Sequence, residues 1–333
     1  MSGLSGRFGS VGNDPHPGSR EAVSFRIVFA GTPQFAVPTL AGLATTHKLV
    51  AILTQPDRPR GRGRSFQPTA VKSWALEHHI EVFTPTSLTD REVREAIRAL
   101  QPDFLIVVAY GLLFPQTWLE LPSIGVLNVH ASLLPRWRGA SPIEYSLLAG
   151  DPQSGVSIQQ VVKQLDAGPV YRQNPVALHP HENQSSLYNR LSELGAQSVL
   201  DVLATWGRVE PTPQDERFVT FAPKINAAHA AISWNQPAPL IERQIRAFEA
   251  HPGAWTLHAG RRIKILEAQT LDLHAMQLPG TFVQGPEETI RVATSQGFLS
   301  VRRLKPEGSR DMTPAQWLNG LQSGQPFRFH STP

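Results

Sequence analysis

Short apolar runs alternate with amphipathic segments through the first half of the chain. The apolar runs lie at residues 24–31, 48–54, 80–83, 103–109 and 124–130. Segments with helical periodicity lie among them, at residues 34–44, 69–79, 89–100 and 141–150. Thr89 and Glu92 have the spacing of a capping box at the start of the third helix. Strands that alternate with helices predict an α/β fold, a doubly wound and mostly parallel, Rossmann-like sheet with helices on both faces.

The pattern changes after residue 151. Two predicted strands, 155–162 and 169–176, follow each other without a helix, and a long helix is predicted for 183–206. Residues 208–224 contain Pro211, Pro213 and Pro223, which is typical of a linker.

Beyond the predicted linker, a helix at 239–248 precedes short strands that are spaced by turns, which predicts a small OB-like β-barrel. These strands are predicted at residues 254–260, 261–268, 280–285 and 289–305. A last helix begins at Thr313, with Gln316 completing a capping box. The predicted domains are 24–207, for catalysis, and 225–333, the barrel, joined by the linker 208–224.

Composition narrows the class of protein. A chain of 333 residues is long enough to form two domains. The absence of cysteine excludes disulfides, zinc–thiolate sites and cysteine nucleophiles, and the net charge of +4 permits an anionic partner. Residues 1–23 are rich in Gly, Ser and Pro and lack the apolar region of a secretory signal, so we expect a disordered extension and a cytoplasmic protein without membrane spans.

Asn128 and His130 end the apolar run at 124–130. Alternate residues of a strand point to the same side, and ligands of open α/β sheets bind at the carboxyl ends of the strands. Histidine moves protons near neutral pH, and an asparagine amide can donate to a developing oxyanion. A structural asparagine turn beside a solvated histidine is the alternative interpretation.

Asp166 is the candidate acid that would orient such a histidine. It lies in "LDAG", between the two strands predicted at 155–162 and 169–176, and therefore on a turn near a strand end. An ordinary Asp-Ala-Gly turn explains the same pattern.

Two arginine-rich segments could meet an anion. The loop at 55–68 follows a predicted strand, and we expect it to open on the same sheet edge as His130; it is either a phosphate-binding loop or a solvated charge run. Its arginines are Arg58, Arg60, Arg62 and Arg64, with Gly61 and Gly63 as mobile points. The loop at 133–142 places two arginines around Trp137 before a helix N-terminus, which suits an anionic substrate.

Together these segments resemble a known family. "NVHASLLPRWRGASPI", with the later "LDAG", resembles the signature of formyltransferases that use 10-formyltetrahydrofolate. "FAGTPQFA", "TQPDRPRGRG", "VVAYG" and "RAFEAHPGAW" resemble the methionyl-tRNA formyltransferase family in order and spacing, from Phe25 to the predicted barrel.

The resemblance implies transfer of a formyl group from 10-formyltetrahydrofolate to the α-amino group of initiator methionyl-tRNA, in support of translation initiation. It implies Asn128 as the oxyanion donor, His130 as the group that assists charge and proton transfer, and Asp166 as its partner and a proton acceptor. It assigns the acceptor-stem contact to the arginine loop, with Arg62 in the key position, and further backbone contacts to the tRNA to the barrel at 225–333. The folate pocket would include Val108, Ala109, Tyr110, Gly111, Leu112, Ser132, Leu133, Leu134, Pro135 and Asp166. No metal is implied, and we expect a monomer.

The sequence departs from the family pattern at Ala131, Gln164 and Pro169 and in "FEAHPGAW". Formyltransferases that act on small amines or amino-sugar nucleotides, and formyltetrahydrofolate hydrolases, share the Asn-His-Asp set and stay as alternatives. A non-catalytic RNA- or nucleotide-binding protein is a third reading. If Asn128, His130 and Asp166 have the roles that the resemblance implies, we expect the Arg-Trp-Arg loop to form a wall of the formyl-transfer pocket.

Arg62→Ala should weaken the use of tRNA far more than it weakens folate binding, because a loop arginine meets phosphates and not a pterin. Steady-state kinetics with tRNA at several salt concentrations, alongside folate titration, measure both effects. Activity should fall steeply with salt, and the slope should become shallower by roughly one unit in the variant. An equal loss of folate binding would contradict the assignment.

Overall fold

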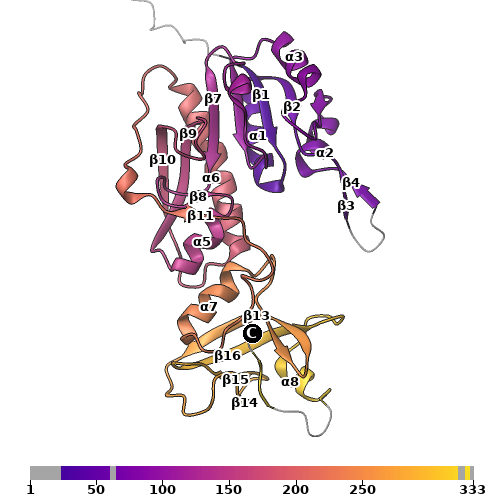
Figure 1. Ribbon diagram of the computed structural model, residues 1–333, viewed down its shortest axis with the longest axis vertical. Helices are drawn as coiled ribbons and strands as arrows, with labels where there is room; N and C mark the ends of the chain where they lie inside the picture. The colour runs from indigo at the N-terminus through magenta and orange to yellow at the C-terminus, as the bar shows by residue number, and fades with distance from the viewer. Residues whose placement is uncertain (1–23, 61–64, 322–326, 331–333) are drawn as a thin grey trace, which may run out of the picture.

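Two sheets dominate the computed structural model, which describes residues 24–60, 65–321 and 327–330. A seven-stranded sheet forms one end of the elongated molecule, and a five-stranded sheet forms the other (Figure 1). The extension predicted at 1–23 lies outside the described residues. No helix in the described ranges is long and apolar enough to cross a membrane.

The seven-stranded sheet has the order β10-β9-β7-β6-β1-β2-β5. Strands β5, β2, β1, β6 and β7 are parallel, and β9 is antiparallel to both of its neighbours. The predicted doubly wound sheet is therefore confirmed. The strand bounds are β1 Arg26–Gly31, β2 Lys48–Leu53, β5 Val82–Phe83, β6 Phe104–Val108, β7 Gly125–His130, β9 Gln153–Gln160 and β10 Val170–Ala177.

Both faces of this sheet are buried, which explains why its central strands are apolar without interruption. In β1, Ile27 and Phe29 belong to one core layer, and Val28 and Ala30 belong to another. Helices α1, α2, α5 and α6 contribute to the first layer, and α3 and α4 contribute to the second. Their bounds are α1 Val37–Thr46, α2 Ala70–Glu77, α3 Arg91–Ala99, α4 Gln116–Leu119, α5 Pro142–Ala149 and α6 Gln184–Ala204, with a short 3-10 turn, η1 Gln34–Ala36, before α1.

The predicted capping box at the start of α3 is wrong. Asp90, not Thr89, is the N-cap, and its carboxylate accepts from the backbone N–H groups of Glu92 at 3.0 Å and Val93 at 3.3 Å. An acidic side chain also interacts favourably with the positive end of the helix dipole, which a threonine does not.

The predicted arginine loop contains a two-stranded ribbon that projects from the body of the domain (Figure 1). Strand β3 (Arg58–Arg60) pairs antiparallel with β4 (Ser65–Gln67). At the base of the ribbon, Asp57 forms an ion pair with Lys72 of α2 at 2.8 Å. Arg62 and Arg64, with the glycines predicted as mobile points, lie outside the described residues.

The connection at 208–224 packs along the first domain. Strand β11 (Phe221–Ala222) pairs parallel with β8 (Arg138–Gly139), and Thr212 bridges to Val170 at the start of β10. A further 3-10 turn, η2 (Glu216–Phe218), lies between these contacts. The segment therefore runs over the loop that follows β7.

The second domain is an antiparallel sheet of order β12-β13-β16-β15-β14, which confirms the predicted small barrel-like fold. The C-terminal residues close it, because His330 bridges to Leu257 at one edge and Arg328 bridges to Thr281 beside the other. Its elements are α7 Ala238–Ala247, β12 Trp255–His258, β13 Arg261–Leu271, β14 Phe282–Gln284, β15 Ile290–Ala293, β16 Phe298–Pro306 and α8 Pro314–Leu318. The capping box of Thr313 and Gln316 is present, as predicted.

Gly139→Ala should lower the free energy of unfolding by about 1–3 kcal/mol, because Gly139 has a φ of +128° and a Cβ there would lie 2.5 Å from the carbonyl oxygen of Ala222. Chemical denaturation of the purified variant measures the change. Gly125→Ala is the matched control, since a Cβ at Gly125 meets nothing within 4 Å. Equal stabilities of the two variants would contradict the role of the β8–β11 contact.

Candidate active site

Asn128 and His130 reach the same cavity from the end of β7. Strand β7 lies between β6 and β9, and Asn128 is opposite Val107 on one side and Gln159 on the other. The two side chains line a cavity of about 600 Å³, together with residues that follow β1 and β6 and residues of α5, α6 and the β9–β10 loop. The alternation of the strand therefore places both polar groups where the sequence predicted them.

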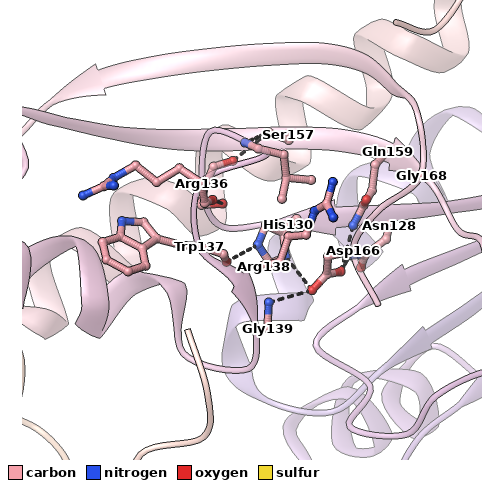
Figure 2. A network of polar contacts seen from close by, with 12 residues as sticks. Asn128, His130, Arg136, Trp137, Arg138, Gly139, Ser157, Gln159, Asp166 and Gly168 are labelled. Carbon is pink, nitrogen blue, oxygen red and sulfur yellow. Dashed lines mark hydrogen bonds and ion pairs between the residues drawn. The ribbon is translucent and has the colours of Figure 1, made fainter. Parts of the chain in front are cut away.

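Asp166 joins them from the β9–β10 loop (Figure 2). The Asn128 amide nitrogen lies 3.4 Å from Oδ1 of Asp166, and Nδ1 of His130 lies 3.6 Å from Oδ2. Asp166 has a positive φ of +50°, an unusual conformation for a residue with a side chain. The turn that the sequence predicted thus brings its carboxylate to the two residues of β7, although 36 positions separate it from His130.

Two further donors hold the same carboxylate, and sequence reasoning missed both. The Gln159 amide donates to Oδ1 at 2.8 Å, and the backbone N–H of Gly139 donates to Oδ2 at 2.9 Å. Gln159 follows Ile158 in β9 and is 1% exposed, and a buried amide needs a hydrogen-bond partner, but the sequence of β9 contains other polar residues and does not single Gln159 out. No local pattern signals a backbone N–H from a loop.

The contacts of His130 indicate its hydrogen positions. Nε2 lies 3.0 Å from the carbonyl oxygen of Trp137, and a carbonyl oxygen only accepts, so Nε2 carries a hydrogen. Nδ1 faces the Asp166 carboxylate. His130 is therefore held by the Trp137 carbonyl through one ring nitrogen and directed at Asp166 through the other.

The Arg-Trp-Arg loop is not an open anion site. Arg136 forms an ion pair with Asp151 at 2.6 Å, and its guanidinium lies 4.2 Å above the Trp137 ring. Arg138 is 1% exposed and pairs with Glu216 at 2.8 Å. Each arginine already has a carboxylate partner. The ion pairs hold the loop in place beside His130 and do not leave either guanidinium free for an anionic ligand.

Part of the predicted folate pocket lines the cavity. Ala109, Tyr110, Gly111, Leu112 and Asp166 do so. Val108 is fully buried at the end of β6 instead. Ser132, Leu133, Leu134 and Pro135 form a turn beside the cavity that is tied to β9, since the Ser157 hydroxyl donates to the Ser132 carbonyl at 2.7 Å and accepts from the Leu134 N–H at 3.0 Å.

The cavity lining is largely apolar, with a few polar groups. The Tyr110 hydroxyl is buried without a hydrogen-bond partner among the described residues, and burial raises the pKa of Tyr110 to about 12. Burial also raises the pKa of the Glu144 carboxyl, which accepts from the Gln184 amide at 2.7 Å. A buried hydroxyl that lacks a partner is suited to hydrogen-bond a bound ligand. Within the described ranges, no group of three or more His, Cys, Asp or Glu side chains could hold a metal ion.

Comparisons with known proteins show the family of the chain. Residues 25–203 match the formyl transferase family, and residues 224–322 match the formyl transferase C-terminal domain. A methionyl-tRNA formyltransferase of Xanthomonas campestris pv. campestris (strain 8004) is 45% identical over 297 residues, which cover 88% of this chain and 97% of the relative.

Solved structures share the fold at low sequence identity. HypX from Aquifex aeolicus in complex with tetrahydrofolic acid is 18% identical, with a TM-score of 0.62 over 91% of this chain and 48% of that one. An N-formyltransferase from Helicobacter canadensis in complex with folinic acid and dTDP-3-aminofucose is 17% identical, with a TM-score of 0.64 over 86% of this chain and all 100% of that one. On the match to both family domains and the identity to the Xanthomonas relative, the chain belongs to the methionyl-tRNA formyltransferase family.

Proposed function

We propose that the protein transfers the formyl group of 10-formyltetrahydrofolate to the α-amino group of initiator methionyl-tRNA, and so supports translation initiation. The observation that carries the proposal is the convergence of Asn128, His130 and Asp166 at one cavity. It occurs in a chain that is 45% identical to a methionyl-tRNA formyltransferase over nearly its whole length.

The cavity fits a folate-linked donor. Its volume of about 600 Å³ lies within the range of small-molecule sites, and its lining is mostly apolar with a few polar groups. Residues Ala109–Leu112 line it, and the buried Tyr110 hydroxyl has no hydrogen-bond partner among the described residues. A structural relative, HypX, binds tetrahydrofolic acid in a fold of this kind, which supports the same class of ligand here.

Each of the three residues has a role in the transfer. The amine nitrogen attacks the formyl carbon, a C–N bond forms, and the carbonyl oxygen gains negative charge. The Asn128 amide carries two N–H groups; the contact to Asp166 uses one, and the other can donate to that oxygen.

Proton movement completes the transfer. Asp166 can accept the proton that the attacking amine loses, and the proton then passes to the donor nitrogen as its bond to the formyl carbon breaks. His130, held by Trp137 and facing Asp166, balances the charge while this occurs.

The tRNA side of the proposal rests on the β3–β4 ribbon and the second domain. The ribbon follows β2, and β2 runs parallel to β7, so it opens on the same edge of the sheet as His130. Arg58 is exposed there, and arginine suits phosphate contacts. We assign Arg58, Arg60, Arg62 and Arg64 to the acceptor stem, and we further propose that the enzyme acts as a cytoplasmic monomer.

A formyltransferase for small amines is the second candidate, because the Helicobacter relative was solved with an amino-sugar nucleotide. The projecting ribbon favours a macromolecular substrate. Parallel assays with charged initiator tRNA, glycinamide ribonucleotide and an amino-sugar nucleotide separate the candidates. Transfer to methionyl-tRNA is expected, and transfer to a small amine alone would overturn the proposal.

Asn128→Ala should lower kcat for methionyl-tRNA formylation by about 10²–10³-fold, because it removes a donor to the developing oxyanion. The Kd for folate should change little, since the amide acts mainly in the transition state. Steady-state kinetics and folate titration measure the two effects. Gln116→Ala, at an exposed amide on α4, is the matched control and should keep wild-type kinetics. Wild-type kcat in Asn128→Ala would rule out the assigned role.

A further inference from the structure

Gln214 connects the interdomain segment to the turn that carries Asp166. Its amide nitrogen donates to the carbonyl oxygen of Asp166 at 2.8 Å and to that of Gly168 at 2.7 Å. Its carbonyl oxygen accepts from Nε of Arg138 at 3.0 Å. One half-buried side chain thus bridges the turn that carries the Asp166 carboxylate and the loop whose Gly139 N–H donates to it (Figure 2 shows the turn and Arg138).

The turn that Gln214 holds is tightly constrained. Asp166 has a φ of +50°, and a Cβ at Gly168 would lie 1.8 Å from the carbonyl oxygen of Gln160. Two carbonyl groups in such a turn need donors, and Gln214 supplies both from one amide. Because the Asp166 side chain leaves from this backbone, the orientation of its carboxylate depends on how firmly the turn is held.

Arg138 extends the same contact to the other side of the carboxylate. It is 1% exposed and bonds to Gln214 and to Glu216, both in the interdomain segment. The next residue, Gly139, donates its backbone N–H to Asp166 at 2.9 Å. The interdomain segment therefore braces both the turn of Asp166 and one of its donors.

We propose that Gln214 is a positioning residue for Asp166, and that Gln214 and Glu216 of the interdomain segment support the active site from outside the cavity. This proposal rests on the proposed formyl transfer. A misplaced carboxylate lowers the rate of the chemical step and leaves substrate binding largely intact.

The test compares Gln214→Ala and Gln214→Glu with the wild type in the full-length chain. Gln214→Glu keeps an acceptor for Arg138 and the length of the side chain, but it turns carboxylate oxygens toward the two carbonyl groups of the turn. We expect kcat for methionyl-tRNA to fall by roughly 10- to 100-fold in both variants. The KM for tRNA, the Kd for folate and the midpoint of thermal unfolding should stay near wild type.

Asp215→Asn is the matched control on the same segment. Asp215 pairs with the exposed Arg217 at 2.6 Å, so its loss should leave kcat unchanged. Wild-type kcat in a folded Gln214→Ala, a raised KM for tRNA at unchanged kcat, or failure of both variants to fold would each overturn the proposal. If the wild type formylates only a small amine, the proposed function fails, and the same kcat comparison on that amine still tests Gln214.

Discussion

The geometry of the site depends on the hydrogen bonds that hold the Asp166 carboxylate. The Gln159 amide and the Gly139 N–H hold its two oxygens at 2.8 and 2.9 Å, and Asn128 and His130 approach the same oxygens. These groups come from β7, from the loop after it and from β9, and Gln214 supports the turn from the interdomain segment. The doubly wound sheet matters for function because it brings these segments to one point.

The Asp166 side chain is only 11% exposed, and burial increases both the strength of these contacts and the cost of losing one. Both arginines of the loop beside His130 are paired, Arg136 with Asp151 and Arg138 with Glu216. Among the polar groups that line the cavity, Asn128, His130 and Asp166 lie together beside the end of β7, and these are the ones that we assign to the reaction. An arrangement with ion-paired arginines around the cavity and hydrogen-bonding groups inside it suits a transfer that requires fixed positions and stabilisation of the developing negative charge.

Local pattern was enough to predict the central strands, the polar ends of β7 and the turn of Asp166. Apolar runs buried on both faces, and alternation within a strand, are properties that adjacent residues carry. The capping residue of α3 was missed because Thr89 and Asp90 are adjacent and both are good caps, and the helix begins at Arg91, one residue later than the Thr-x-x-Glu spacing indicated. Gln214 lies 48 positions from Asp166, and no local pattern predicts a contact over that separation. Strands β8 and β11 have two residues each, which is too short to show a periodicity. The family resemblance supplied roles for residues, and the structure supplied the partners that hold them.

The measurement that tests the account most directly is single-turnover formyl transfer to methionyl-tRNA by Asp166→Asn. The asparagine keeps the shape of the side chain but lacks the negative charge that accepts a proton beside His130. We expect a chemical step slower by roughly 10²–10⁴-fold, with folate binding near wild type. A single-turnover rate equal to wild type would contradict the claim that this carboxylate is the centre of the site.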